Sequence, residues 1–144
     1  MPNNLKNLIT FIPLTSIALV IRDAPTGGNI LTSAQNTFWM RVGNICFVWC
    51  ALDNIVIGAA TPGNTVYITG LPYQAVRTAL GVPYTYRITQ AGQLQCSMGI
   101  NTGTVLFSDA TAGGEATLKV SGLLSPSGSS LGFTLSYPVA PEAA

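Results

Sequence analysis

The sequence predicts an all-β protein, an antiparallel β-sandwich or jelly-roll-like domain with a short extended N-terminal arm. Short runs of β-branched and aromatic residues alternate with clusters of Gly, Pro, Asn and Ser, at the spacing typical of a sandwich or barrel. No segment shows a convincing helical pattern, and 144 residues make one domain of ordinary size. We place the arm, a possible attachment segment, at residues 1–14 and a single β-sandwich domain at residues 15–144.

The candidate strands in order are Asn7–Ile12, Ser16–Arg22, Thr37–Val42, Ile45–Leu52, Thr65–Thr69, Thr85–Thr89, Leu94–Ile100, Thr104–Ser108, Ala116–Val120 and Leu131–Tyr137. Turn-forming clusters separate them at Pro25–Gly28, Pro62–Asn64, Gly81–Pro83, Ala91–Gly92, Gly113–Gly114 and Ser125–Ser130. Ser127–Ser130 reads as a flexible loop.

The apolar runs near the start of the chain are too short to span a bilayer. Leu8–Leu14 and Ile17–Ile21 are interrupted by Pro13, Thr15 and Ser16, whereas a membrane helix needs roughly 18 apolar residues. The beginning of the chain also lacks the pattern of a signal peptide. We therefore expect neither a membrane partner nor export, and folding in a cytoplasm.

Gly43-Asn44 lies between two strong strands. Both residues tolerate positive φ, so a tight hairpin is one interpretation, and a β-bulge within a continuing strand is the other.

The next strand is apolar on both faces. Ile45, Phe47, Trp49 and Ala51 share one face, and Cys46, Val48, Cys50 and Leu52 share the other. A strand of this kind must be covered twice, and one cover is the facing sheet. The other is either a part of the same chain or a neighbouring subunit, and the pattern does not choose between them.

Two later strands alternate more cleanly. Tyr84, Tyr86, Ile88 and Gln90 share one face of the predicted strand at residues 85–89, opposite Thr85, Arg87 and Thr89. In the closing strand, Leu131, Phe133, Leu135 and Tyr137 line one face. Aromatic residues at alternating positions of a strand more often belong to a core or a subunit interface than to a ligand-binding surface.

Composition argues against catalysis and against nucleic acid. The chain has no histidine, five carboxylates and 8% charged residues, where about a quarter is usual for a soluble domain. Asp53 and Asp109 are the best candidates for a glycosidase pair, but neither lies in a recognisable motif. The six Lys and Arg residues are scattered, without the basic patch that a phosphate backbone requires. We expect no enzyme, no catalytic residue, no cofactor and no nucleic-acid partner.

The three cysteines, Cys46, Cys50 and Cys96, cannot all pair within one chain. On a strand, Cys46 and Cys50 would be roughly 13 Å apart, too far for a disulfide. We predict buried free thiols and no metal site, since no histidine exists to complete one.

Four segments together resemble the head domains of tailed-phage fibre proteins and related virion proteins. They are "FIPL" at Phe11–Leu14, "FWMRVGN" at Phe38–Asn44, "VYITGLPY" at Val66–Tyr73 and "LSYP" at Leu135–Pro138. Trp39, Gly43, Asn44, Gly70, Leu71 and Pro72 are the fold-defining motif residues in this resemblance. It implies a β-sandwich head that assembles as a homotrimer in a virion.

The chain lacks coiled-coil heptads, collagen-like repeats and a β-helical shaft, and only the arm is left for attachment. We therefore predict a trimeric capsid decoration (cement) protein that binds the major capsid protein lattice of a bacteriophage and stabilises the head. Phe47, Trp49, Tyr84 and Tyr86 are the candidate subunit-interface residues. The alternative is a receptor-binding tail fibre tip for host surface carbohydrate, with Trp39 and the tyrosines stacking on sugar and Asn29, Gln35 or Asn64 hydrogen-bonding to it.

Overall fold

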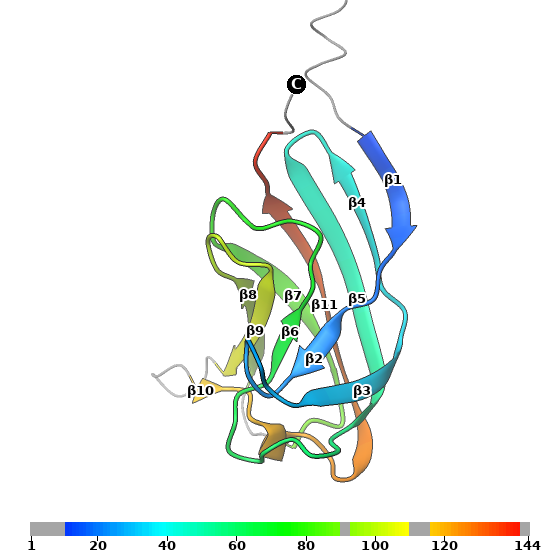
Figure 1. Cartoon of the computed structure of the whole chain (residues 1–144), viewed down its shortest axis with the longest axis vertical. Coiled ribbons are helices and arrows are strands. Elements are labelled where there is room, and N and C mark those ends of the chain that lie inside the picture. Colours follow the sequence, from blue (N-terminus) through cyan, green and yellow to red (C-terminus); the bar gives the residue numbers. More distant parts are fainter. Residues whose placement is uncertain (1–10, 90–92, 110–115, 142–144) are drawn as a thin grey trace, which may run out of the picture.

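The computed structural model describes residues 11–89, 93–109 and 116–141, and within them every element of regular secondary structure is a strand apart from one 3₁₀ turn (Figure 1). The elements are β1 (Phe11–Ser16), β2 (Val20–Arg22), β3 (Ile30–Gln35), β4 (Phe38–Val42), β5 (Ile45–Val56), β6 (Tyr67–Thr69), β7 (Ala79–Tyr86), β8 (Leu94–Met98), β9 (Thr104–Asp109), β10 (Ala116–Thr117), a 3₁₀ turn η1 (Val120–Gly122) and β11 (Ser127–Pro138).

The strands close into an antiparallel barrel, so the predicted sandwich is wrong. Within the described residues the order β5-β11-β7-β8-β9-β6-β2-β3 returns to β5, because β3 pairs with both β2 and β5. These eight strands form the closed wall, while β4 and β1 extend from β5 and β10 pairs with β9. Closure removes the open edges that a sandwich leaves at each sheet.

The long strand β5 makes this closure possible. Its first part pairs with β4, from Val42 opposite Ile45 to Phe38 opposite Trp49. Its last part pairs with β3, with Gln35 opposite Leu52 and Thr32 opposite Val56. One twelve-residue strand therefore belongs both to the barrel wall and to the extension that carries β4 and β1 (Figure 1). A sandwich and a barrel share the same inside-outside alternation, so the sequence pattern could not tell them apart.

The barrel interior is filled by apolar side chains from every wall strand. On β11 the inward residues are Leu131, Phe133, Leu135 and Tyr137, all buried as the alternation predicts. Phe133 packs against Phe107 of β9 across the interior, with ring centroids 6.5 Å apart. The interior is thus a packed core, which is normal for eight strands.

Several observed strands differ in their bounds from the predicted ones. β3 was not predicted, the strand at Ser16–Arg22 is divided between β1 and β2, and the strand at Thr85–Thr89 is instead Ala79–Tyr86. Pro83 was read as a turn residue, yet it lies inside β7 opposite Phe133. The strand ends where Arg87 takes a positive φ of 53°. Propensity places Pro and Gly in turns, and here strand pairing overrides it, since Gly81 pairs with Cys96 of β8 and Pro83 with Phe133 of β11.

The segment Ser127–Ser130 is part of β11 and not the predicted flexible loop. Its anchor is Ser129, which is buried. The Ser129 hydroxyl donates to the Arg87 carbonyl at 2.7 Å and accepts from the Leu124 N–H at 2.8 Å. One local and one long-range hydrogen bond thus hold a serine-rich stretch in extended form.

Gly43-Asn44 forms a tight hairpin, and the alternative of a bulge is wrong. Val42 and Ile45 pair directly on either side of the two-residue turn, with no shift in the register of β4 and β5. Gly43 has a φ of 57°, which glycine adopts without strain.

Both ends of the described chain lie at this hairpin. Phe11 of β1 pairs with Val42, and the Val139 N–H donates to the Asn44 carbonyl at 2.9 Å (Figure 1). β1 crosses the boundary that we drew at residue 14, since it runs from Phe11 to Ser16. The rest of the predicted arm and the start of the predicted strand Asn7–Ile12, residues 1–10, lie outside the described residues. None of the described segments is a helix of the length and apolarity that crossing a membrane requires.

Candidate functional site

The outward side of β5 is apolar and lies on the surface. Cys46, Val48, Cys50 and Leu52 point into the barrel and are at most 5% exposed. Trp49, on the opposite side of the same strand, is 40% exposed, Ile45 is similarly open, and Phe47 is half-buried. The sequence did not decide whether the outward apolar side of β5 is covered by the same chain or by a neighbouring subunit. The described part of this chain does not cover it.

The neighbouring strand β11 supplies small residues beside these large ones. Thr134 pairs with Trp49 of β5 on one side and with Val82 of β7 on the other. Ser136, two residues further along β11, pairs with Phe47 of β5. Paired residues face the same side of a sheet, so large side chains flank a row of small ones. The result is a groove along the outside of β11.

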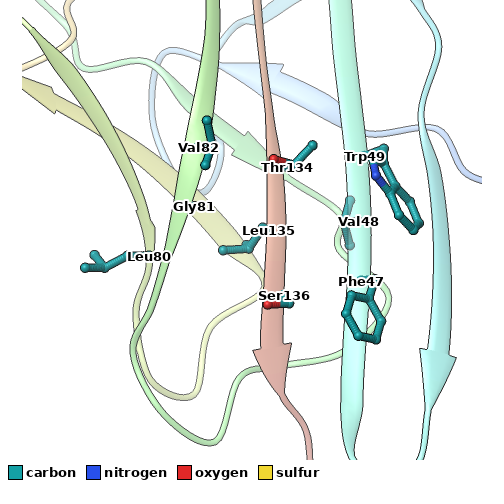
Figure 2. Close-up of a pocket in the computed structure, with 9 residues that line it drawn as sticks. All are labelled: Phe47, Val48, Trp49, Leu80, Gly81, Val82, Thr134, Leu135 and Ser136. Carbon is teal, nitrogen blue, oxygen red and sulfur yellow. The ribbon is translucent and has the colours of Figure 1, made fainter.

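This groove, which we call the β11 groove, has a volume of about 280 Å³ (Figure 2). Thr134 and Ser136 form its floor, Phe47 and Trp49 stand on the β5 side, and Leu80 and Val82 stand on the β7 side. A second hollow of about 370 Å³ continues it past Trp49 and Val82 toward Asn36, Phe38, Pro83 and Tyr84. Among the described residues, those that line the two hollows include no charged one.

The outward residues of β7 form a protruding row beside the groove, the β7 ridge. Leu80 is 76% exposed, Val82 69%, Tyr84 45% and Tyr86 55%. Figure 2 shows the Leu80 side chain pointing away from β11. Monomeric proteins seldom expose so many large apolar side chains in one row, and such patches usually mark a binding surface.

Glycine at position 132 permits the close packing of strands under this face. A Cβ atom there would overlap the carbonyl of Cys50 on β5. Gly132 lies between Ala51 of β5 and Tyr84 of β7. No larger residue fits between these two strands without moving the backbone.

All four predicted interface residues, Phe47, Trp49, Tyr84 and Tyr86, lie on this one outer face. The structure brings together two strands that are distant in sequence through β11, which pairs with both. Sequence reasoning missed Leu80, Val82, Thr134 and Ser136, because Gly81–Pro83 was read as a turn and the polar side of β11 as ordinary solvent-facing residues. Alternation extended backward from Tyr84 would have found Leu80 and Val82.

The motif residue Trp39 lies elsewhere, beside Tyr73 at the end of the Val66–Tyr73 segment. Trp39 packs edge-on against the Tyr73 ring at 5.6 Å, and the Arg41 guanidinium lies 4.8 Å above the same ring. The Tyr137 hydroxyl donates to the Tyr73 carbonyl at 3.1 Å. Gly70, with a φ of 97°, and the buried Leu71 lead from β6 into this segment, with Pro72 after them. Three of the four segments that carry the resemblance thus converge on Tyr73.

Arg41 is itself buried, with its charge held by main-chain oxygens. Its Nε donates to the Gly43 carbonyl at 2.7 Å and its Nη2 to the Ala140 carbonyl at 2.9 Å. These bonds tie the end of β11 to the β4–β5 hairpin, which is a structural role.

The amides proposed for carbohydrate are used in internal hydrogen bonds. Gln35 both donates to the Leu19 carbonyl at 2.6 Å and accepts from its N–H at 2.9 Å. The side chains of Asn29 and Asn64 both donate to the buried carboxylate of Asp23, at 3.0 and 3.3 Å. These three side chains hold loops together, away from the β11 groove.

Asp23 is the centre of that loop anchor. Its carboxylate also accepts from the Thr61 N–H at 3.0 Å and the Asn29 N–H at 2.6 Å. These bonds, that of Thr61 above all, lower the Asp23 pKa to about 2, because each donor favours the ionised form. Asp23 therefore ties the β2–β3 connection to the β5–β6 connection.

The thiols are buried and free, as predicted. Burial raises the pKa of Cys50 to about 12 and that of Cys96 to about 11, and it also raises the pKa of Cys46. Thiols with such pKa values are inert toward oxidants and electrophiles near neutral pH.

The carboxylates considered for a glycosidase lie on strands that are not neighbours in the barrel, Asp53 on β5 and Asp109 on β9. Within the described ranges, no three residues of the types that bind metal ions cluster together.

Comparison of the chain with known protein families, with curated proteins and with solved structures found no match. The resemblance to phage fibre heads consequently stays a prediction, and the outer face of β5, β11 and β7 is the candidate site on physical grounds.

Proposed function

We propose that this chain is a structural protein of a bacteriophage particle, and specifically a capsid decoration protein. It assembles as a homotrimer on the lattice of the major capsid protein and stabilises the head. In this role it needs no catalytic residue, cofactor or metal, and it joins the virion in the host cytoplasm.

The observation that carries the proposal is the exposed apolar face of β5, β11 and β7, in which none of the described residues lining the two hollows is charged. Its open side chains include Trp49, Leu80 and Val82, which gain free energy when they leave water. A chain with 8% charged residues has few groups to keep such a face in solution by itself. Permanent assembly explains both the composition and the face.

In the proposed mechanism, apolar surface that is buried when the protein binds the capsid lattice stabilises the head. A protein that binds only the intact lattice lowers the free energy of the assembled head relative to its separated parts. Apolar area buried between the decoration protein and its neighbours offsets the outward pressure of packed DNA. No covalent chemistry is needed.

The test is to locate the chain in purified particles by cryo-electron microscopy, with a deletion strain as the comparison and the complemented strain as control. We expect density at regularly spaced capsid sites that disappears on deletion, together with heads that burst more easily on heating. Particles that lack the chain at every position would overturn the proposal.

The second candidate function is a tail fibre tip that binds host surface carbohydrate. The exposed rings of Trp49, Tyr84 and Tyr86 favour it, because flat aromatic faces stack on sugar rings. In this case density would be lost only at the tail, and the deletion strain would fail to adsorb to its host. Quenching of Trp49 fluorescence by host polysaccharide, absent in a Trp49→Leu variant, would support it further.

A further inference from the structure

The β11 groove and the β7 ridge lie side by side on one face and have matching chemistry. The groove is a row of small residues between large ones, and the ridge is a row of large residues that protrude. We propose that copies of this chain pack the β7 ridge of one copy into the β11 groove of the next. This inference rests on the proposed function for the number of copies, and it assigns the surface through which they meet.

The exposed area suits an interface between copies. With about 150–250 Å² for a whole aromatic side chain, the open fractions of Trp49, Tyr84 and Tyr86 amount to about 300 Å². Leu80 and Val82 add roughly 150 Å². Phe11, Val42 and Ile45 extend the same side of the sheet, since they pair in a row across β1, β4 and β5 and are all exposed. Together they approach the roughly 800 Å² per partner of a standard interface.

The chemistry favours a second copy over a charged or sugar partner. Neither hollow holds an Asp, Glu, Lys or Arg to pair with a charged partner. The most exposed ridge residues, Leu80 and Val82, offer a sugar hydroxyl no hydrogen bond. Hydroxyl groups occur on both parts, on Thr134 and Ser136 in the groove and on Tyr84 and Tyr86 in the ridge, so the two can satisfy one another across the contact.

The arrangement is compatible with a ring. Ridge and groove lie on one face, so two copies could exchange the contact reciprocally in an isologous dimer, whereas the proposed trimer requires a heterologous contact in which the ridge of each copy enters the groove of the next. Such a contact closes into a cyclic oligomer when the rotation between copies allows it, and three copies are the number that we propose for the virion.

The experiment measures the mass of the purified full chain by light scattering across a range of concentrations. Tyr86→Glu places a charge on the part of the ridge that lines neither hollow, and Thr134→Glu places one in the groove; both positions are exposed. The matched control is Ile100→Glu, at a 51% exposed residue in the turn after β8. Circular dichroism checks that every variant is folded.

We expect the wild type and Ile100→Glu to form the same cyclic oligomer. Each of the other two variants should dissociate with a dissociation constant higher by on the order of 30-fold or more, as expected when a central interface residue is lost. A mixture of Tyr86→Glu and Thr134→Glu should form a two-chain complex, because the ridge of the second still fits the groove of the first.

A wild type that stays monomeric, or variants that assemble as the control does, would overturn the interface. A mixture in which neither variant binds the other would overturn the ridge-in-groove geometry. Either result leaves the particle imaging to decide separately whether the chain belongs to a virion.

Discussion

The two faces of β5 differ in what covers them, although both are apolar. Val48 and Leu52 face the barrel interior and are buried by the chain's own strands, whereas Ile45 and Trp49 face outward and are well exposed. A hydrophobic pattern predicts that a surface is favourable to bury. It does not say whether the cover comes from the same chain or from another one, because the free energy per unit of apolar area is the same in both cases. The predictions below separate the two faces by experiment.

The largest effect is expected on the inner face. Phe133→Ala removes a buried ring that packs against Phe107, and the cavity left behind should cost about 3–5 kcal/mol of the free energy of unfolding. Urea unfolding followed by circular dichroism measures it. A loss below about 1 kcal/mol would mean that the barrel interior is not packed as described.

A smaller loss of the free energy of unfolding is expected from Gly132→Ala, at the residue of β11 that lies between Ala51 of β5 and Tyr84 of β7. The added methyl group would meet the Cys50 carbonyl, so β5 and β11 must move apart, at a cost of about 1–3 kcal/mol. The same urea titration tests it. The control is Gly63→Ala, where an added Cβ meets nothing within 4 Å and the φ is not in the left-handed region; equal losses for both variants would contradict the close packing at Gly132.

Asp23→Asn measures how much a buried polar group contributes to the free energy of unfolding, for comparison with the apolar interior. The variant loses the charge in several charge-assisted hydrogen bonds and should cost roughly 1–3 kcal/mol at pH 7. The Asp23 pKa is about 2 in the folded chain and 3.8 ordinarily, so the carboxylate stabilises the fold above pH 3.8 and this contribution is lost as the pH falls toward 2.

Thermal unfolding between pH 2 and pH 6 measures this dependence. The wild type should lose stability more steeply than Asp23→Asn over the lower part of that range. Parallel curves would show that Asp23 does not carry the dependence.

The smallest effect on folding is expected on the outer face. Leu80→Ser should change the free energy of unfolding of the dilute monomer by less than about 1 kcal/mol, since the residue is 76% exposed and little of it is buried by its own chain. The same change should weaken self-association, because a large apolar residue of the ridge is lost. Unfolding at low protein concentration, paired with light scattering at high concentration, separates the two. Loss of folding together with assembly would show that Leu80 is packed within the single chain.

Most of the local structure was predictable from the sequence. The alternation in Leu131–Tyr137 and the buried thiols were predicted correctly, and the hairpin at Gly43-Asn44 was one of the two structures that the sequence allowed there. The errors arose where a distant strand overrides local preference, as at Pro83 within β7 and Ser127–Ser130 within β11. Four residues of the candidate site were predicted from their apolar character. Leu80 and Val82 were missed because the start of β7 was placed six residues too late.

The sequence by itself determined that this chain is all-β, that one strand carries two apolar faces and that the residue types most used for proton transfer are scarce. Only the tertiary structure decided that the sheet closes into a barrel and that β5, β11 and β7 lie side by side. Both facts depend on pairing between strands that are far apart in the chain. The alternation of apolar and polar residues does not determine which strands pair. The groove and ridge arise from that pairing, since small residues of β11 are placed between large residues of two other strands.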